Sequence, residues 1–154
     1  MYDIEEVIKH RKPMRLVDQL VSFDDTSACV LVHTHENSEF YQAKQQGVPS
    51  YIGIEYMAQC IAAKAGANEL ASGGVLKLGF LLGTRKYKPT VAFFPCGETL
   101  RVTVTQLIED SAGLSVFDCT IVLNNQVEKV LAQAKINVFQ PENSEAYLQE
   151  QAQE

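Results

Sequence analysis

The segment of residues 49–63, PSYIGIEYMAQCIAA, most constrains how this chain can fold. Apolar side chains fill nearly every side of the helix that it predicts, and small alanines recur from residue 58 to residue 65. Such a helix is too apolar to rest on a flat sheet with its other side in water. We therefore expect a curved sheet that wraps around the helix and comes close at the alanines, with room for a partner that also covers it.

Two polar side chains interrupt this apolar helix. Glu55 and Gln59 are four residues apart, so they share one helical face and lie in a partly dry place. Burial of an unpaired carboxylate is costly and usually raises its pKa instead. A carboxyl group with a raised pKa suits acid/base catalysis near neutral pH. A satisfied buried Glu, or a Glu at the rim of an interface, explains the same pattern without catalysis.

The size and charge of the chain restrict its class. Its 154 residues suit one domain with a substantial core, which we place at residues 1–141, followed by an acidic, Gln-rich tail at 142–154 that is helical or disordered. The net charge of −6 and the lack of a basic face argue against nucleic-acid binding. No apolar run suits a membrane span, and the acidic N-terminus does not resemble a signal peptide, so we expect a cytoplasmic protein.

The cysteines do not form a reactive or metal-binding motif. The four of them are far apart, with no CxxC pair: Cys29, Cys60, Cys96 and Cys119. This spacing argues against a zinc site and against dithiol chemistry. We expect free cysteines that act as small buried hydrophobic residues, and no bound metal.

Turn signals and alternating patterns define the other elements. A short helix is expected at residues 2–9, and strands at 16–23, 28–34, 76–87, 99–107, 114–123 and 127–139. Ser50 is the expected N-cap of the long helix, and Gly73-Gly74 its C-terminal stop. The sequence therefore predicts an α+β fold with two strands, one helix and then four strands that pair antiparallel.

Five segments together resemble the FabZ/FabA-like 3-hydroxyacyl-acyl-carrier-protein dehydratases. Residues 10–18, HRKPMRLVD, resemble that family's HRxPxLLVD, residues 37–42 its NEPFFxG, residues 49–59 its PGVLxxEAxAQ, residues 95–100 its PGDxL, and residues 137–139 its last strand. Residues 79–85, GFLLGTR, with 48–55 and 139–141, further resemble the ApeP-like branch, which is associated with aryl polyene pathways. The resemblance implies a hot-dog fold, in which a long antiparallel sheet wraps one central helix.

The resemblance also implies a reaction and a set of site residues. These enzymes dehydrate acyl thioesters on a carrier protein, using a histidine and an acidic helix residue that come from different subunits. Glu55 matches the acidic residue, and the expected substrate-binding positions are Gln59, Gly53, Gly79 and Phe80. The substrate is carried on phosphopantetheine, so no separate cofactor is expected.

The chain departs from the family where the catalytic histidine should lie. The family places it in GHFPGxP, whereas residues 43–49 here read AKQQGVP and contain no histidine. Lys44 lies near that position, and a lysine of ordinary pKa is a poor base at neutral pH. His35, near the end of the second strand, is the candidate replacement if the following loop folds back. His10 belongs to an N-terminal segment that is structural in the resembling family.

These observations leave the partners and the reaction open. We expect a homodimer, or a heterodimer with a FabZ-like subunit that supplies the histidine. Arg85, Lys86 and Lys88, with Lys77 upstream, either dock an acidic acyl carrier protein or form a solvated strand end. The alternatives to a dehydratase are a hot-dog thioesterase that uses Glu55 as nucleophile or general base, and a non-catalytic partner subunit.

Overall fold

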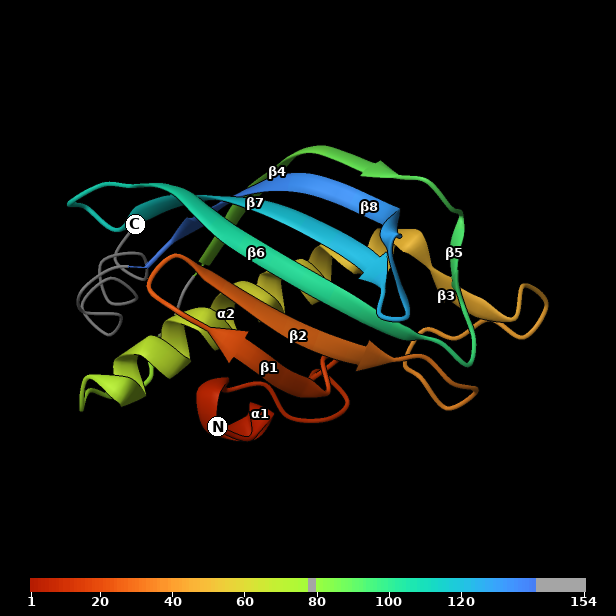
Figure 1. Cartoon of the computed structure of the whole chain (residues 1–154), viewed down its shortest axis with the longest axis horizontal. Helices are drawn as coiled ribbons and strands as arrows, with labels where there is room; N and C mark the ends of the chain where they lie inside the picture. Colours follow the sequence, from red (N-terminus) through yellow and green to blue (C-terminus); the bar gives the residue numbers. More distant parts are fainter. Residues whose placement is uncertain (78–79, 141–154) are drawn as a thin grey trace, which may run out of the picture.

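One long helix lies inside a curved antiparallel sheet in the computed structural model (Figure 1). The structure describes residues 1–77 and 80–140, with only the backbone of residues 80–82. The helical elements are α1 (Ile4–Val7), the 3-10 turn η1 (Ser50–Ile52) and α2 (Gly53–Ala71). The strands are β1 (Gln19–Phe23), β2 (Ser27–His33), β3 (Gly47–Pro49), β4 (Phe80–Pro89), β5 (Phe93–Pro95), β6 (Thr99–Glu109), β7 (Leu114–Leu123) and β8 (Gln126–Phe139).

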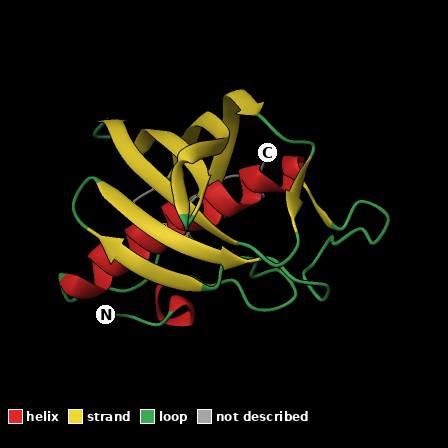
Figure 2. Ribbon diagram, turned by 45° about the vertical axis from the view of Figure 1, so that its right-hand side comes forward, coloured by secondary structure: helices red, strands yellow, loops and turns green. Residues whose placement is uncertain are grey.

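The main sheet has six strands in the order β1-β2-β6-β7-β8-β4, all paired antiparallel. Its register aligns a row of fully buried side chains across four strands: Val30, Val102, Ile121 and Ala132. This row lies under the middle of α2, where the Cys60 Sγ is 3.6 Å from the Val102 carbonyl oxygen. The hot-dog arrangement expected from the sequence is therefore present, and Figure 2 shows α2 threading along the concave side of the sheet.

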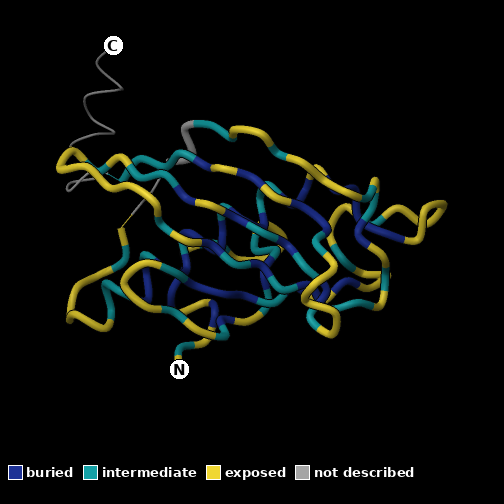
Figure 3. The backbone as a smooth tube through the Cα atoms, turned by 45° about the horizontal axis from the view of Figure 1, so that its top comes forward, coloured by how far each residue is buried: buried dark blue, intermediate teal, exposed yellow. Residues whose placement is uncertain are grey.

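Most of the surface of helix α2 is covered, as its apolar composition predicts. Met57, Cys60, Ala63 and Ala67 have no exposed surface, and the buried segments run through the middle of the molecule (Figure 3). The helix ends as expected, because Gly73 adopts a φ of +83° and the Gly74 N–H donates to the Glu69 carbonyl at 2.8 Å.

The sequence prediction is wrong at several element boundaries. Ser50 is not an N-cap: it lies inside the 3-10 turn, and no side chain caps either that turn or α2. The short pair β3–β5 was not predicted, because three-residue strands carry too little alternation to be recognised. The N-terminal helix and first strand are shorter than expected, and the predicted tail at 142–154 lies outside the described residues.

Helix α1 packs directly on α2 at a glycine. A Cβ atom at Gly66 would overlap the backbone carbonyl oxygen of Val7, so only glycine lets the two backbones come this close. Val7 and Ile8 are buried at this contact, and they form one wall of the cavity that is described below.

We predict that Gly66→Ala destabilises the fold, although alanine is the better helix former by roughly 1 kcal/mol. The clash with the Val7 backbone should cost about 1–3 kcal/mol, measured by urea unfolding. Gly83→Ala in β4 is the matched control, because no described atom outside its two chain neighbours lies within 4 Å of the position that a Cβ would take there. Equal stability of the two variants would contradict the packing role of Gly66.

Candidate active site

Glu55 lies in the first turn of α2, at the edge of the covered part of the helix. Its carboxylate accepts a hydrogen bond from the Gln59 Nε2 at 3.0 Å, and the His10 Nε2 lies 4.0 Å from the same oxygen. The side chain is 44% exposed in the single chain. This intermediate exposure agrees with the predicted partly dry carboxylate, and fuller desolvation of Glu55 would require a second molecule.

Gln59 is fully buried and uses all of its hydrogen-bonding capacity within the chain. Its Oε1 accepts from the backbone N–H groups of Leu16 (2.8 Å) and Val17 (3.3 Å). Its Nε2 donates to the Met14 carbonyl (2.8 Å) and to Glu55. With two donors and two accepting lone pairs engaged, the amide has no polar position left for a ligand. Gln59 thus ties the segment before β1 to α2 and orients the carboxylate, whereas its direct contact with substrate stays a prediction.

His10 is the histidine that the structure brings to Glu55. Its side chain is 36% exposed, yet its Nδ1 is buried and has no hydrogen-bond partner among the described residues. The family resemblance implied that the segment containing His10 is structural. The contact of His10 with Glu55 was not predicted, because it joins distant segments and depends on how the chain turns after α1. The motif of residues 10–18 was the only sequence feature that drew attention to His10, and it does not indicate how far His10 lies from α2.

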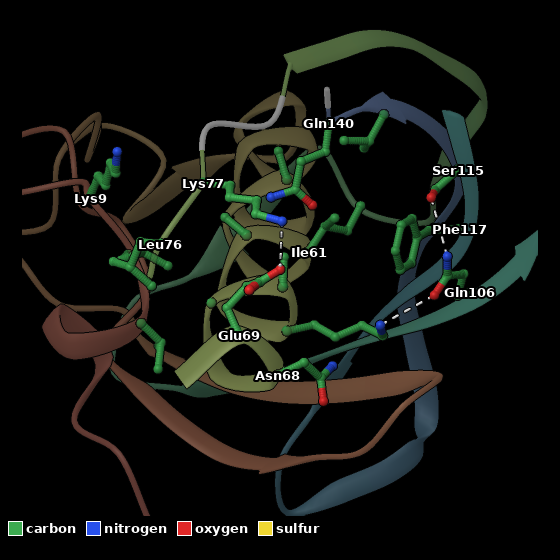
Figure 4. A pocket seen from close by; sticks show the side chains of 18 of the residues that line it. Lys9, Ile61, Asn68, Glu69, Leu76, Lys77, Gln106, Ser115, Phe117 and Gln140 are labelled. Carbon is green, nitrogen blue, oxygen red and sulfur yellow. Dashed lines mark hydrogen bonds and ion pairs between the residues drawn. The ribbon is translucent and has the colours of Figure 1, made fainter. Parts of the chain in front are cut away.

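The Glu55 and His10 side chains line one cavity of about 540 Å³ that follows the outer face of α2 as far as Glu69. The segment that follows α1 forms one wall, and residues of β6, β7 and β8 form the other (Figure 4). Its apolar lining includes Val7, Ile8, Ile61, Leu76, Phe117 and Val138. About half of the lining residues are polar or charged, so the cavity suits an extended ligand that has both apolar and polar parts.

The structure does not bring His35 to Glu55 within one chain. His35 lines a separate cavity of about 80 Å³ together with Asp18, His33 and Tyr56. Its Nδ1 accepts a hydrogen bond from the Asn37 N–H at 3.0 Å, so the imidazole is held by the turn after β2. A site that combines His35 with Glu55 is therefore not formed inside a single chain, and the catalytic role of His35 stays a prediction.

The other predicted substrate positions are Gly53, Gly79 and Phe80, and the structure describes the surroundings of Gly53 alone. Gly53 is buried, and a Cβ there would overlap the Tyr87 hydroxyl and lie 2.9 Å from the Phe94 ring, so packing alone requires glycine. Burial raises the pKa of Tyr87 to about 12, and its hydroxyl donates to the Ser50 carbonyl. Gly79 lies outside the described residues, and only the backbone of Phe80 is described, so both stay predictions.

The predicted docking residues are exposed on an edge strand. Arg85, Lys86 and Lys88 lie on β4, with Lys86 at a φ of +53° within an irregularity of the ladder to β8. Arg85 lies opposite Lys135, which is also exposed, so the basic surface extends onto β8. Lys77 is instead paired with Glu69 at 3.2 Å and lines the cavity.

The four cysteines are free, as predicted, and three are buried. Burial raises the pKa of Cys119 to about 12 and that of Cys60 well above its ordinary value, so these thiols are not nucleophiles. Within residues 1–77 and 80–140, no group of three or more His, Cys, Asp or Glu side chains is placed to hold a metal ion. No helix in that part of the chain is both long and apolar enough to cross a membrane.

We predict that Gln59→Leu destabilises the protein by about 3 kcal/mol, because it leaves buried backbone groups of residues 14–17 without partners. Urea unfolding measures the loss. Gln45→Leu, at an exposed turn position, is the control and should change stability by less than about 0.5 kcal/mol. If Gln59→Leu were as stable as the control, the amide would not hold this segment.

Comparison with known proteins gives one family and several structural neighbours. The family described as ApeP dehydratase, ApeP-like, matches residues 2–149. The fold is similar to a chain of the dehydratase heterocomplex ApeI:P from Xenorhabdus doucetiae, with a TM-score of 0.86, 25% identity and 97% coverage of both chains. No curated protein sequence matches this chain significantly.

Two more distant neighbours share only the fold. A hypothetical thioesterase from Streptococcus pneumoniae, solved with coenzyme A, has a TM-score of 0.62 and 10% identity over 79% of this chain and 84% of its own. The PaaI protein of the phenylacetic acid degradation operon of E. coli has a TM-score of 0.58 and 17% identity, covering 78% and 80%. Because the family match spans nearly the whole chain, this protein belongs to the ApeP-like dehydratase family.

Proposed function

We propose that this chain is a subunit of a 3-hydroxyacyl-acyl-carrier-protein dehydratase, and that Glu55 is its acid/base group. The observation that carries the proposal is the Glu55 carboxylate, oriented by Gln59 at one end of a long cavity, in a chain of a dehydratase family. The family branch supports a setting in aryl polyene-type biosynthesis, where the acyl group is carried on phosphopantetheine.

Dehydration needs two proton transfers. A base removes a proton from C2, the C2–C3 double bond forms, and the C3 hydroxyl leaves as water after it takes a proton from an acid. In this proposal, Glu55 donates that proton. The thioester oxygen gains negative charge as the C2 proton leaves, and the nearby N-terminus of α2 stabilises such charge.

The second group comes from a partner subunit in this proposal. Residues 43–49 lack the family histidine, and the solved relative is a dehydratase heterocomplex. Apolar side chains are exposed near Glu55: Tyr51, one helical turn before it, is 64% exposed, and Met14, whose carbonyl binds Gln59, is 70% exposed. A FabZ-like subunit that covers these residues would exclude water from Glu55 and bring a histidine to it.

We predict that Glu55→Gln lowers dehydration by the mixed subunits by about 10²–10⁴-fold, because the amide cannot donate the required proton. The measurement is conversion of a 3-hydroxyacyl carrier protein by this chain with a histidine-containing FabZ-like partner from the same genome. Glu128→Gln, at an exposed position of β8, is the control.

Activity of this chain without a partner would contradict the shared site. His10→Gln would then test the histidine nearest to Glu55, and His35→Gln the one predicted from sequence. Release of free thiol from acyl thioesters without dehydration would establish the thioesterase alternative. Full activity of Glu55→Gln in the mixture would leave a non-catalytic role for this chain.

The exposed basic residues of β4 support docking of an acidic acyl carrier protein. We predict that Arg85→Gln combined with Lys86→Gln weakens carrier-protein binding several-fold at low salt and little at high salt, because exposed charges are screened. Calorimetric titration at two ionic strengths measures this. Lys44→Gln with Lys129→Gln removes the same charge elsewhere, and an equal loss in that control would exclude a specific docking surface.

A further inference from the structure

His10 differs from the other two histidines of the chain in its hydrogen bonding. The His33 Nδ1 lies 3.1 Å from the Thr99 Oγ1. The His35 Nδ1 accepts from the Asn37 N–H at 3.0 Å, so both of these rings are held through that nitrogen. The His10 Nδ1, by contrast, is buried and has no hydrogen-bond partner among the described residues. A buried polar atom without a partner is uncommon in proteins, and a catalytic role is one of the accepted explanations.

The other ring nitrogen of His10 faces the proposed acid. The His10 Nε2 lies 4.0 Å from the Glu55 Oε1, and within the described part of the chain no other side chain makes an ion-pair contact with this carboxylate. A histidine that serves as a fixed donor or acceptor is usually set in one tautomer by a hydrogen bond at its second nitrogen. His10 lacks that bond, so its ring can gain and lose a proton at Nε2. The His10 side chain is also 36% exposed, which gives it contact with solvent.

The proposed dehydration requires a group that exchanges protons with Glu55. Once Glu55 has protonated the leaving hydroxyl it is a carboxylate, while the base of the partner subunit holds the proton from C2. The next turnover needs a proton on Glu55 again. Gln59 cannot supply it, because an amide N–H is not acidic and all of its hydrogen-bonding positions are engaged. Hydronium is scarce at neutral pH, whereas an imidazole both takes up and releases protons there.

We propose that His10 returns the proton to Glu55 after each turnover, an inference that rests on the proposed function. The Nε2–H bond of the imidazolium breaks, its electron pair stays on the nitrogen, and the proton forms the O–H bond of Glu55. Because 4.0 Å exceeds a hydrogen bond, the transfer passes through one water molecule or follows a small rotation of the ring.

The protons balance over the whole cycle. The neutral imidazole of His10 takes a proton from solvent, and the partner's base releases to solvent the proton that it removed from C2. His10 therefore acts on the substrate only through Glu55. It is a positioning residue for the proton of the acid, and it is distinct from the base that attacks C2.

The test is His10→Ala in the mixture with the FabZ-like partner. Steady-state kcat should fall roughly 10-fold or more, because Glu55 regains its proton slowly. The first turnover, followed by rapid quenching, should keep its rate within about 2-fold, because Glu55 of the resting enzyme has already equilibrated with solvent. A burst of one product per site then precedes the slow phase. Imidazole added at constant pH should restore kcat by carrying the proton. His33→Ala, at an exposed position, is the control and should change neither phase.

An equal loss in the first turnover and in the steady state, without a response to imidazole, would assign His10 a structural role and overturn the inference. His10→Gln keeps a polar side chain of similar size that carries no proton, and it should show the same burst if His10→Ala fails to fold. Adding His10→Ala to Glu55→Gln should lower the residual rate no further. A fully active His10→Ala mixture would overturn this inference alone, whereas no dehydration by the wild-type mixture would overturn the proposed function as well.

Discussion

The buried amide of Gln59 connects the parts of the molecule on which the candidate site depends. It joins the backbone of residues 14–17 to α2 through three hydrogen bonds and gives its fourth to Glu55. The chain before β1 would otherwise run past the helix with unpaired backbone groups, which is costly in a buried place. The same amide therefore fixes the first segment of the fold and the direction of the carboxylate.

This connection explains why His10 and Glu55 meet. The N-terminal segment is held at one end by Gln59 and at the other by the close contact of Gly66 with the Val7 backbone. His10 lies between these two attachments, so its imidazole is brought to the edge of α2 and to the mouth of the cavity. Ion pairs of Arg15 with Glu5 (3.0 Å) and with Asp18 (3.8 Å) also hold this segment.

The sequence was sufficient for the features that depend on local pattern. The apolar composition of residues 49–63 predicted a wrapped helix, and alternating patterns predicted the strands that carry the buried Val30 and Val102. The spacing of Glu55 and Gln59 correctly placed them together. The features that the sequence did not predict depend on contacts between distant segments. They are the hydrogen bonds of the Gln59 amide to residues 14–17, the contact of His10 with Glu55, and the separate cavity that His35 lines. Lys64 is a single cation in an alanine-rich helix, which the sequence shows. Its hydrogen bond to Gln106 on β6 could not be predicted from that pattern.

Under the proposed function, the exposure of Glu55 separates a complete catalytic site from half of one. A carboxylate that is 44% exposed is solvated by water, and water weakens the electrostatic and proton-transfer advantages that a dry site provides. The apolar Tyr51 and Met14 side chains beside it are exposed as well, which costs free energy in a lone chain and is recovered when a second surface covers them. Under the proposed function, this chain gains a functional carboxylate only on association, and the same association excludes water from the cavity that would hold the acyl group. In that proposal assembly and activation are one event, and the free subunit does not act on thioesters without its partner.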